Sequence, residues 1–456
     1  MRILAEPFAK SLLHLPIVSK KLKISVIGTG YLGATHAACM SNLGFEVIGI
    51  DTDQAKIDSL SRGELPFYEP GLDELLVAEL KTGRLTFTTD FAAAADADVH
   101  FICVGTPQSK DSLAADLTYV ESAITNIAPH AKSGSLIAGK STVPVGTAQR
   151  LSAILAKSAP NVELAWNPEF LREGFAVEDT LRPNRLVVGV TSDQAENILK
   201  EVYKSLIDAG TPWIRADLPT AELVKVAANS FLATKISFIN AMAEICEAAG
   251  GDVTVLAKAI GYDPRIGSRF LQAGIGFGGG CLPKDIRAFM ARAEELGAMQ
   301  ALEFLREIDA INVRARQRVI DVVRGELSED LTQYRLAVLG AAFKPDSDDV
   351  RDSPALDIAA QLQAAGSSVV VHDPKAIANA KKRFPNLNFA TTVEECVVGA
   401  DLILHLTEWR EYRELSPSAI KALVKGAIII DGRNALDRDK WVVAGWRFHA
   451  LGRTPV

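Results

Sequence analysis

The sequence predicts an α/β protein with two Rossmann-like, doubly wound domains that are joined by a long central helix and a helical connector. Three observations lead to this fold class. Apolar strands alternate with helices over residues 23–215, a helical pattern without proline or glycine occupies residues 221–249, and the strand-helix alternation resumes after residue 331. Such alternation is typical of parallel sheets covered by helices on both faces. The length of 456 residues agrees with it, since about 150 residues per domain is usual.

The first domain is expected over residues 23–215. A short apolar strand leads through a glycine-rich turn into a helix, and a second apolar strand ends at Asp51. Further buried strands are expected at residues 99–104, 136–138 and 162–165. Residues 1–22 mix charges and prolines with apolar residues, and we interpret them as a poorly ordered extension rather than a leader peptide. The alternative is a helix over residues 8–18 that lies on a membrane or a partner.

A helical connector is expected over residues 216–330. Residues 221–249 carry apolar side chains at spacings of three and four and end at Gly250 and Gly251, which predicts one long, mostly buried helix. A second helical pattern follows at residues 302–323. Helical segments of this kind often form dimers, so a homodimer or a higher homo-oligomer is expected.

The second Rossmann-like domain is expected over residues 331–456. Its strands are predicted at residues 335–343, 367–374, 402–406 and 427–430, with a helix at residues 353–365. An acidic residue, Asp373, lies at the end of its second strand, as Asp51 ends the second strand of the first domain.

Composition excludes several classes of function. The chain carries 49 Lys and Arg against 56 Asp and Glu, a net charge of −7, and has no basic patch of the kind that binds nucleic acid. No apolar run reaches the roughly 18 residues that a membrane span needs. The five cysteines are scattered and odd in number, which argues against a disulfide framework or a structural metal site. We therefore expect a cytoplasmic protein with no metal site.

A dinucleotide site is expected at the first strand-helix junction. Gly28, Gly30 and Gly33 form a GxGxxG turn there, in which glycines permit a tight turn and the close approach of a pyrophosphate to the helix start. Asp51 follows at the distance, about 20 residues, that suits a ribose-binding carboxylate. Its charge would repel a 2′-phosphate, so NAD is predicted rather than NADP. The alternative is that the glycines serve only the turn.

The equivalent turn of the last domain lacks the glycine pattern. It places Lys344 in this turn instead, with Arg351 nearby, so it suits phosphate groups of a ligand other than NAD. The alternative for Lys344 is a solvated loop lysine.

Cys281 differs from the other cysteines. It follows the glycine-rich residues 276–280 and precedes a helix with Pro283 in its first turn. A helix start and the neighbouring Lys284 are expected to lower the pKa of the thiol, which predicts a thiolate nucleophile. Asp285 lies one turn further on the same face, and the alternative is a glycine-rich hinge. The remaining cysteines lie in apolar patterns and are interpreted as packing residues: Cys39, Cys103, Cys246 and Cys396.

Lys225 and Asn229 are four residues apart in the long helix and project from one face. Such a pair of donors would stabilise an oxyanion, although simple solvation of the lysine is the alternative. Glu169 and Glu173 follow a predicted strand, with Arg172 between them. They suit substrate binding and water positioning, or else form a capped or salt-bridged surface loop.

Eight ordered motifs resemble the UDP-glucose/GDP-mannose dehydrogenase family: VIGTGYLG, VIGID, VGTP, KSTVPVG, NPEFLREG, KVAANSFLATKISFIN, GFGGGCLPKD and AAFKPDSDDVRDSPA. The family oxidises the C6 hydroxymethyl group of a nucleotide sugar to a carboxylate with two NAD, through an aldehyde, a cysteine thiohemiacetal and a thioester. The resemblance implies this activity with UDP-glucose as substrate, and a place in polysaccharide biosynthesis. It extends from Lys23 to about Arg433. Gly280 departs from the serine of many members, which is expected to change loop freedom more than chemistry.

The resemblance also implies roles for individual residues, and Arg265 matches an arginine that reaches the neighbouring subunit's site. The catalytic set is Cys281, Lys225, Asn229, Asp285, Glu173, Thr142 and Glu169. The NAD contacts are Gly28, Thr29, Gly30, Tyr31, Leu32, Gly33, Asp51, Lys56, Thr106, Thr142, Glu173, Lys284 and Arg351. The substrate contacts are Glu169, Phe170, Leu171, Arg172, Glu173, Lys225, Asn229, Arg265, Phe270, Leu271, Gln272, Ala273, Gly274, Gly278, Phe343, Lys344 and Arg433.

Other activities stay open at this point. Within the family, GDP-mannose or a UDP-N-acetylhexosamine is the alternative substrate, because spacing does not locate the contacts that distinguish base and sugar. A two-electron hydroxy-acid dehydrogenase also joins a Rossmann domain to a helical section, but it would not need Cys281. A non-catalytic NAD sensor would need few of the polar residues.

Overall fold

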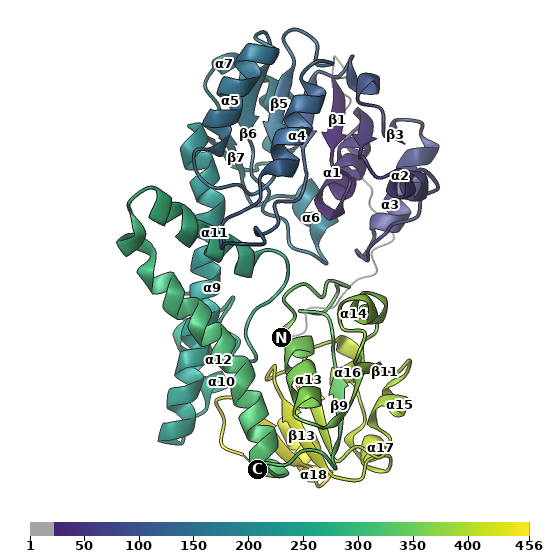
Figure 1. The fold of residues 1–456 in the computed structure, drawn as a ribbon, viewed down its shortest axis with the longest axis vertical. Helices are drawn as coiled ribbons and strands as arrows, with labels where there is room; N and C mark the ends of the chain where they lie inside the picture. Colours follow the sequence, from purple (N-terminus) through teal and green to yellow (C-terminus); the bar gives the residue numbers. More distant parts are fainter. Residues whose placement is uncertain (1–21, 456) are drawn as a thin grey trace.

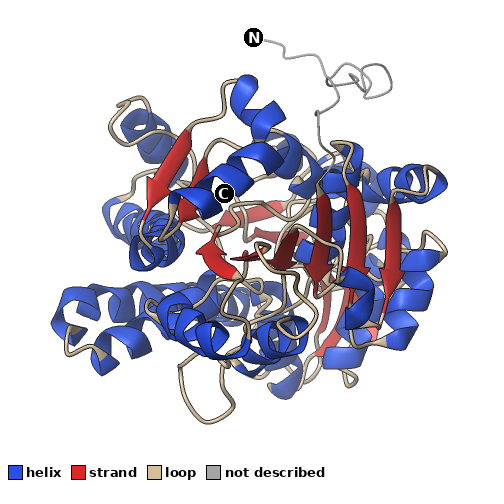
Figure 2. Cartoon of the chain, turned by 90° about the horizontal axis from the view of Figure 1, so that it is seen from above, coloured by secondary structure: helices blue, strands red, loops and turns tan. Residues whose placement is uncertain are grey.

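The computed structural model describes residues 22–455, so the extension expected over residues 1–22 lies almost wholly outside the described residues. Two α/β lobes lie at opposite ends of the molecule, and helices of the connector run along one side of both (Figure 1). Seen from above, helices cover both faces of the strands (Figure 2). The predicted fold class is confirmed. Within the described residues, every helix is too short or too polar to cross a membrane.

The first lobe contains a sheet of eight described strands in the order β3-β2-β1-β4-β5-β6-β7-β8. Its strands are β1 (Lys23–Ile27), β2 (Glu46–Ile50), β3 (Leu85–Thr88), β4 (Val99–Ile102), β5 (Leu136–Gly139), β6 (Glu163–Trp166), β7 (Leu186–Gly189) and β8 (Trp213–Ala216). Its helices are α1 (Tyr31–Asn42), α2 (Gln54–Ser61), α3 (Leu72–Lys81), α4 (Thr118–Ile127), α5 (Thr147–Ser158), α6 (Ala176–Leu181), α7 (Asp193–Val202) and α8 (Lys204–Asp208), with a 3-10 turn at Phe91–Ala94.

One strand pair departs from the parallel sheet that the sequence predicts. β6 and β7 are antiparallel, paired at Trp166 and Gly189, whereas β7 and β8 are again parallel. A parallel return would need a crossover of a dozen or more residues across the face of the sheet, usually a helix. The helix between these strands, α6, has only 6 residues. The chain therefore enters β7 at the same end of the sheet at which it leaves β6, and β7 runs antiparallel to β6.

The connector contains α9 (Leu218–Ala249), α10 (Val253–Gly261), α11 (Leu282–Glu295) and α12 (Glu303–Glu326), with a 3-10 turn at Met299–Leu302. α9 packs against β7 and α5 of the first lobe and against α11 and α12, while α12 packs against α13 of the other lobe. The long helix is less buried than predicted, because Phe231, Phe238 and Ile245 are 67%, 47% and 61% exposed. These residues recur every seven positions and form an apolar stripe on the outer face of α9.

The last lobe contains a parallel sheet of six described strands in the order β11-β10-β9-β12-β13-β14. The strands are β9 (Arg335–Leu339), β10 (Ser368–His372), β11 (Asn388–Phe389), β12 (Leu402–His405), β13 (Ile428–Asp431) and β14 (Arg447–Ala450). The helices are α13 (Pro354–Ala364), α14 (Ile377–Arg383), α15 (Val393–Val397), α16 (Arg410–Arg413), α17 (Pro417–Lys421) and α18 (Arg438–Val443).

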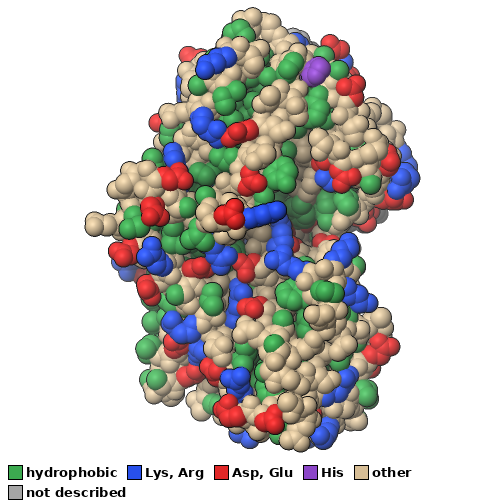
Figure 3. Space-filling view, in the orientation of Figure 1, with side chains coloured by type: hydrophobic (Ala, Val, Ile, Leu, Met, Phe, Trp, Pro, Cys, Tyr) green, Lys and Arg blue, Asp and Glu red, His purple; other side chains and the backbone are tan. Residues whose placement is uncertain are grey.

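The two lobes present the carboxyl ends of their strands to each other. The residues that follow β6 hydrogen-bond to residues that follow β9, for example at Lys344 and Glu173. In open α/β sheets, ligands bind beyond the carboxyl ends of the strands. The fold therefore directs the site to the junction of the lobes, where the surface is hollowed and bordered by Lys and Arg side chains (Figure 3).

Candidate active site

The GxGxxG turn between β1 and α1 has the geometry of a dinucleotide-binding turn. Gly28 adopts a positive φ of 87°, and a Cβ at Gly33 would lie 1.7 Å from the carbonyl oxygen of Gly28, so both positions require glycine. A Cβ at Gly30, in contrast, would meet no protein atom within 4 Å. Since no side chain caps the start of α1, its backbone amides face this open position and fit a pyrophosphate.

Asp51 lies beside this turn at the end of β2. Its carboxylate accepts hydrogen bonds from the Thr29 amide and from Lys56 Nζ, both at 2.8 Å, and from the Asp53 amide at 3.1 Å. Burial raises the pKa of Asp51, but these donors outweigh it, so the pKa lies below its ordinary value. The carboxylate is therefore ionised and suits the hydroxyl groups of a ribose, although Lys56 is bound to it rather than free.

Cys281 is the N-cap residue of α11 and lies where all three parts of the chain meet. The loop before it is held by the last lobe, since the Gly279 amide donates to the Arg351 carbonyl at 2.8 Å. The Cys281 thiol is exposed, whereas the other four cysteines are buried, as predicted. The sequence therefore identified the one accessible thiol.

The pKa predicted for this thiol is wrong in direction. The protein packed around Cys281 and then the Asp285 carboxylate raise the pKa above its ordinary value, although the side chain reaches solvent at one side. Lys225 and Lys284 lower the pKa of Cys281, but the helix start and these lysines do not outweigh burial and the two carboxylates, Asp285 and Glu173. The thiol is protonated near neutral pH and needs a base.

The two donors of α9 both lie near Cys281 but differ in their partners. The Asn229 amide donates to Asp285 Oδ2 at 2.6 Å, in a contact that is fully buried. Lys225 Nζ lies 5.5 Å from the centre of the Phe170 ring and, among the described residues, has no hydrogen bond or ion pair. Lys225 is therefore the freer donor for an oxygen atom beside Cys281.

Asp285 also links Cys281 to the predicted NAD contacts. Lys284 Nζ donates to Asp285 Oδ1 at 2.5 Å and to Thr106 Oγ1 at 3.4 Å, and Thr106 Oγ1 donates to the Thr142 carbonyl at 2.8 Å. Thr106, Thr142, Lys284 and Asp285 line one cavity with Val226 of α9. The cavity lies between the loops that follow β4 and β5 and the first turns of α11.

Glu173 is the carboxylate that the last lobe encloses. Lys344 Nζ donates to its backbone carbonyl at 2.6 Å, and its side chain accepts from Ser347 Oγ at 3.1 Å and pairs with Arg351 at 3.3 Å. Burial and the nearby Asp349 raise the pKa of Glu173 to about 7. A carboxyl group with this pKa exchanges protons near neutral pH.

Glu169 contacts a buried lysine and the backbone of its own loop. Its Oε2 pairs with the buried Lys140 at 3.0 Å, and its Oε1 accepts from the amides of Phe170 and Leu171 at 2.8 and 3.1 Å. Both oxygens thus hold the loop in place. Glu169 shapes the start of the predicted substrate loop, while Arg172 at its exposed side pairs with Asp179 at 2.7 Å.

The other predicted substrate contacts border the last lobe. Arg433 donates to the carbonyls of Gly276 and Phe343 at 3.0 and 2.9 Å. A Cβ at Gly274 would lie 2.5 Å from the Gly432 carbonyl oxygen, so residues 270–274 pack against the loop that follows β13. Within that segment Leu271, Ala273 and Gly274 are buried and Gln272 is exposed. At Gly278 a Cβ would lie 2.3 Å from the Asp352 carbonyl oxygen.

Gly280 has a different consequence from the expected change in loop freedom. A Cβ at this position would lie 2.2 Å from Cζ of Arg351. The glycine thus makes room for the Arg351 guanidinium beside the Cys281 loop.

Arg265 is a predicted site residue that the structure does not bring to the junction of the lobes. Its side chain is 87% exposed and pairs with Asp263 of its own chain at 2.6 Å. Ten of the predicted residues converge on the junction of the lobes. These are Thr106, Thr142, Glu173, Lys225, Asn229, Cys281, Lys284, Asp285, Lys344 and Arg351.

Two residues with a clear place in the site were given no role of their own. Lys140 pairs with Glu169 and donates to Asn167 Oδ1 at 3.1 Å, whereas the sequence placed it only in the KSTVPVG segment at the carboxyl edge of the sheet. Glu69 accepts hydrogen bonds from the Tyr31 hydroxyl and from the Gly174 amide. A glutamate between Tyr68 and Pro70 gave no indication of these distant partners.

Three family models match the chain in order. Residues 22–207 match the NAD binding domain, residues 219–314 the central domain and residues 337–438 the UDP binding domain of the UDP-glucose/GDP-mannose dehydrogenase family. The NAD binding domain contains the GxGxxG turn and Asp51, so NAD is the cofactor, as predicted.

Relatives of known name match over nearly the whole chain. The UDP-glucose 6-dehydrogenase of Rhizobium meliloti is 39% identical over 95% of this chain and 100% of its own length. UDP-glucose 6-dehydrogenase TuaD of Bacillus subtilis is 41% identical over 95% of this chain and 94% of its own. A solved UDP-glucose dehydrogenase from Pyrobaculum islandicum is 34% identical, with a TM-score of 0.88, and the match covers 96% of this chain and 99% of the other.

Proposed function

The chain belongs to the UDP-glucose/GDP-mannose dehydrogenase family, and on that premise we propose that it oxidises UDP-glucose to UDP-glucuronate with two molecules of NAD. The observation that carries this proposal is the exposed thiol of Cys281 between an NAD binding and a UDP binding domain, beside Lys225, Asn229 and Asp285. Oxidation of an alcohol to a ketone needs no nucleophile. Oxidation to an acid without release of an aldehyde is favoured by covalent capture.

The proposed chemistry balances as follows. The β1–α1 turn would hold NAD, which would supply the hydride acceptor for both oxidations, with NADH replaced by NAD between them. The C6 hydroxymethyl group loses a proton from its oxygen and a hydride from its carbon and becomes an aldehyde. The Cys281 sulfur then bonds to this carbon, while a base takes the thiol proton and the carbonyl oxygen gains a proton, which gives the thiohemiacetal. Loss of the hydroxyl proton and a second hydride converts the thiohemiacetal into a thioester. Water then adds, the C–S bond breaks, and a carboxylate and the free thiol are formed.

Each step places a demand on this chain's residues. The C6 oxygen carries negative charge in the transition states, and Lys225 Nζ and the Asn229 amide are donors beside the thiol. The raised pKa of Cys281 requires a proton acceptor, and Glu173, with a pKa raised to about 7, suits that task. We propose that Thr142 and Asp285 position the water that hydrolyses the thioester and the side-chain amide of Asn229. We propose that Glu169 supports the substrate loop.

Cys281→Ser tests the covalent step. Serine lacks the nucleophilic sulfur, so complete turnover should fall by at least about 10³-fold, while NAD affinity stays within twofold of the wild type. Cys246→Ser, in the same connector but buried in α9, is the matched control and should keep wild-type turnover. Full turnover of Cys281→Ser would contradict the thioester route.

The substrate is tested by a panel of nucleotide sugars. UDP-glucose, GDP-mannose, UDP-N-acetylglucosamine and UDP-N-acetylmannosamine should be compared by kcat/KM, with UDP-glucose preferred. The second candidate is a UDP-N-acetylhexosamine, because a solved UDP-D-ManNAc dehydrogenase from Pyrococcus horikoshii matches with 28% identity and a TM-score of 0.83, over 95% of this chain and 99% of the other. Activity on that sugar without activity on UDP-glucose would overturn the preferred substrate.

We also propose a homodimer formed through the apolar stripe of α9. Phe231, Phe238 and Ile245 are large apolar side chains exposed at intervals of seven residues along α9, and repeated exposure of this kind is typical of an interaction surface. Arg265 is exposed on the same connector and suits a contact with the neighbouring subunit's site. Light scattering at micromolar concentration should show a dimer, and Phe238→Glu should give monomers. A wild-type monomer would exclude both proposals.

We propose residues 23–215, 216–330 and 331–456 as the three domains, and the cytoplasm as the compartment. The described cysteines are all free thiols, which suits a reducing environment.

A further inference from the structure

Glu69 joins two parts of the site that are distant in sequence. It lies between α2 and α3 and is 2% exposed. Its Oε2 accepts from the Tyr31 hydroxyl and, at 2.6 Å, from the Gly174 amide, while its Oε1 accepts from the Ala176 amide at 2.7 Å. Tyr31 is the first residue of α1 in the cofactor turn, and Gly174 directly follows Glu173. A single carboxylate therefore contacts both the cofactor side and the Glu173 loop.

A simple helix cap does not account for this arrangement. The amides of Gly174 and Ala176 lie at the start of α6, where a nearby Ser, Thr or Asp would serve as a cap. Glu69 lies instead 105 residues before Gly174 in the sequence, and it also accepts a hydrogen bond from the Tyr31 hydroxyl. The Gly174 amide lies 3.1 Å from the same Tyr31 oxygen, so the tyrosine, the glutamate and the loop form one closed cluster.

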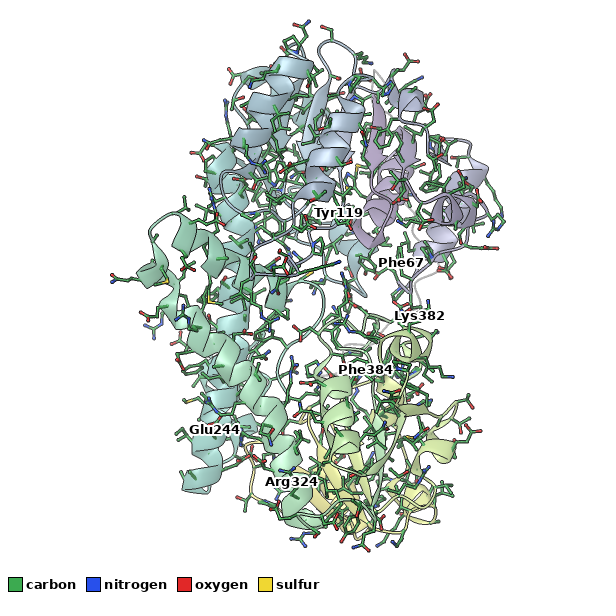
Figure 4. The ribbon with its side chains drawn as sticks, viewed as in Figure 1. Phe67, Tyr119, Glu244, Arg324, Lys382 and Phe384 are labelled. Carbon is green, nitrogen blue, oxygen red and sulfur yellow. The ribbon has the colours of Figure 1, made fainter. Side chains whose placement is uncertain are left out.

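The segment around Glu69 also contacts the last lobe. Lys375 Nζ lies 4.5 Å from the centre of the Tyr68 ring. The Phe67 ring lies 4.9 Å from the Tyr31 ring, at the edge of the first lobe that faces the last one (Figure 4). Residues 67–69 thus contact the cofactor turn, the Glu173 loop and the UDP binding domain.

We propose that Glu69 is a positioning residue that couples NAD binding at the start of α1 to the order of residues 170–176. A ligand that holds Tyr31 in place also holds Glu69, and Glu69 in turn holds the amide next to Glu173. Removal of this link displaces a carboxylate that must meet the reacting atoms within a fraction of an ångström. The assignment of Glu173 rests on the proposed function, whereas the coupling to NAD does not.

Hydrogen exchange measures the coupling without turnover. In the wild-type protein, saturating NAD should slow exchange of the amides in residues 170–176. Glu69→Gln places an NH2 group against backbone donors and should abolish this NAD-dependent protection. Glu79→Gln is the matched control: Glu79 is 4% exposed in the same lobe and binds Ser41, Asn42 and Arg84 away from the site. It should keep the protection.

Kinetics provide the second measurement. Glu69→Gln should lower kcat about 10- to 100-fold, the scale of a small displacement at a reacting centre, and change KM for UDP-glucose less than threefold. If Glu69→Gln does not fold, Tyr31→Phe tests the same link, because it removes only the hydroxyl group. It should reduce both kcat and the NAD-dependent protection of residues 170–176.

Loss of protection only in Glu69→Gln and Tyr31→Phe supports the coupling. NAD-dependent protection that survives in Glu69→Gln, or that is absent in the wild type, overturns it. If the wild-type protein oxidises no nucleotide sugar, the proposed function fails, but the exchange measurement still decides the coupling because it needs only NAD.

Discussion

The two Rossmann-like lobes contain the same strand-turn-helix junction but use its carboxylate in opposite ways. Asp51 follows β2 beside the β1–α1 turn, and Asp373 follows β10 beside the turn after β9. Asp373 is 2% exposed and accepts from five donors: the amides of Ala341, Ala342, Lys375 and Ala376 at 2.7–2.9 Å, and Trp409 Nε1 at 3.1 Å. Five donors saturate a carboxylate, which has about four acceptor sites.

Asp51 keeps the capacity that Asp373 has lost. Its Oδ1 accepts only the Asp53 amide among the described residues, and its side chain is 11% exposed. The comparison teaches that topology alone does not make a dinucleotide site. A carboxylate with acceptor positions left can accept ribose hydroxyls, which is the role predicted for Asp51, whereas one whose positions are filled by the protein's own amides is a structural support.

The largest effect is expected at the saturated carboxylate. Asp373→Asn replaces an acceptor oxygen by an NH2 group that faces buried amides, so the free energy of unfolding should fall by about 3 kcal/mol. Urea unfolding measures it, and NAD affinity measured below the transition should be unchanged. Weakened NAD binding with an unchanged free energy of unfolding would contradict this assignment, because Asp373 would then act on the cofactor and not as a structural support.

Asp51→Asn should show the opposite pattern. Loss of charge-assisted bonds to ribose hydroxyls costs roughly 1.5–3 kcal/mol, so the Kd for NAD should rise about 10- to 100-fold. Calorimetric titration checks the affinity, and the free energy of unfolding should change by less than about 1 kcal/mol. An unaltered Kd would exclude Asp51 from the cofactor site.

Lys344 tests what the second turn does in place of binding NAD. Burial lowers the pKa of Lys344, and its Nζ donates to the Glu173 carbonyl at 2.6 Å. Lys344→Met should raise KM for UDP-glucose about tenfold, the effect of losing one bond to a charged group, with no change in NAD affinity. A change in NAD affinity alone would place the lysine on the cofactor side.

The smallest effect is a shift of the pH profile. Because the pKa of Glu173 is raised to about 7, activity that needs its carboxylate should rise through pH 7. Ser347 donates to this carboxylate at 3.1 Å, so Ser347→Ala should move that limb upward by less than about one pH unit. The reverse shift, or none, would show that Glu173 does not govern the limb.

The same pKa makes a prediction about stability. The raised value favours the protonated side chain in the folded state, so Glu173 contributes stability that is present below its ordinary pKa and is lost as the pH rises through 7. Urea unfolding should show that the free energy of unfolding falls more steeply with pH in the wild type than in Glu173→Gln, and only between the ordinary pKa of a glutamate and about 7.

Local sequence patterns predicted the elements whose cause is local. The Gly28–Gly33 turn, the long helix α9 and the helix that starts after Cys281 each follow from residues within a few positions. The antiparallel strand β7 was not foreseen, because it depends on how short α6 is.

Contacts between distant residues decided the rest. The pKa of Cys281 was predicted in the wrong direction because burial, the largest cause of the increase, and the Glu173 carboxylate come from distant parts of the chain, and they add to the effect of Asp285 on the same helix. Lys140 and Glu69 bind partners 27 and 105 residues away, and such pairings leave no periodic signal in one sequence. Side-chain chemistry was thus easier to predict than the partners that modify it.

The most direct test of the account is the stoichiometry of NADH on UDP-glucose. With limiting UDP-glucose and excess NAD, the account predicts two NADH for each sugar consumed, with UDP-glucuronate as the product and no free aldehyde. A ratio of one, with an aldehyde or ketone accumulating, would contradict it and favour a two-electron dehydrogenase that does not use Cys281.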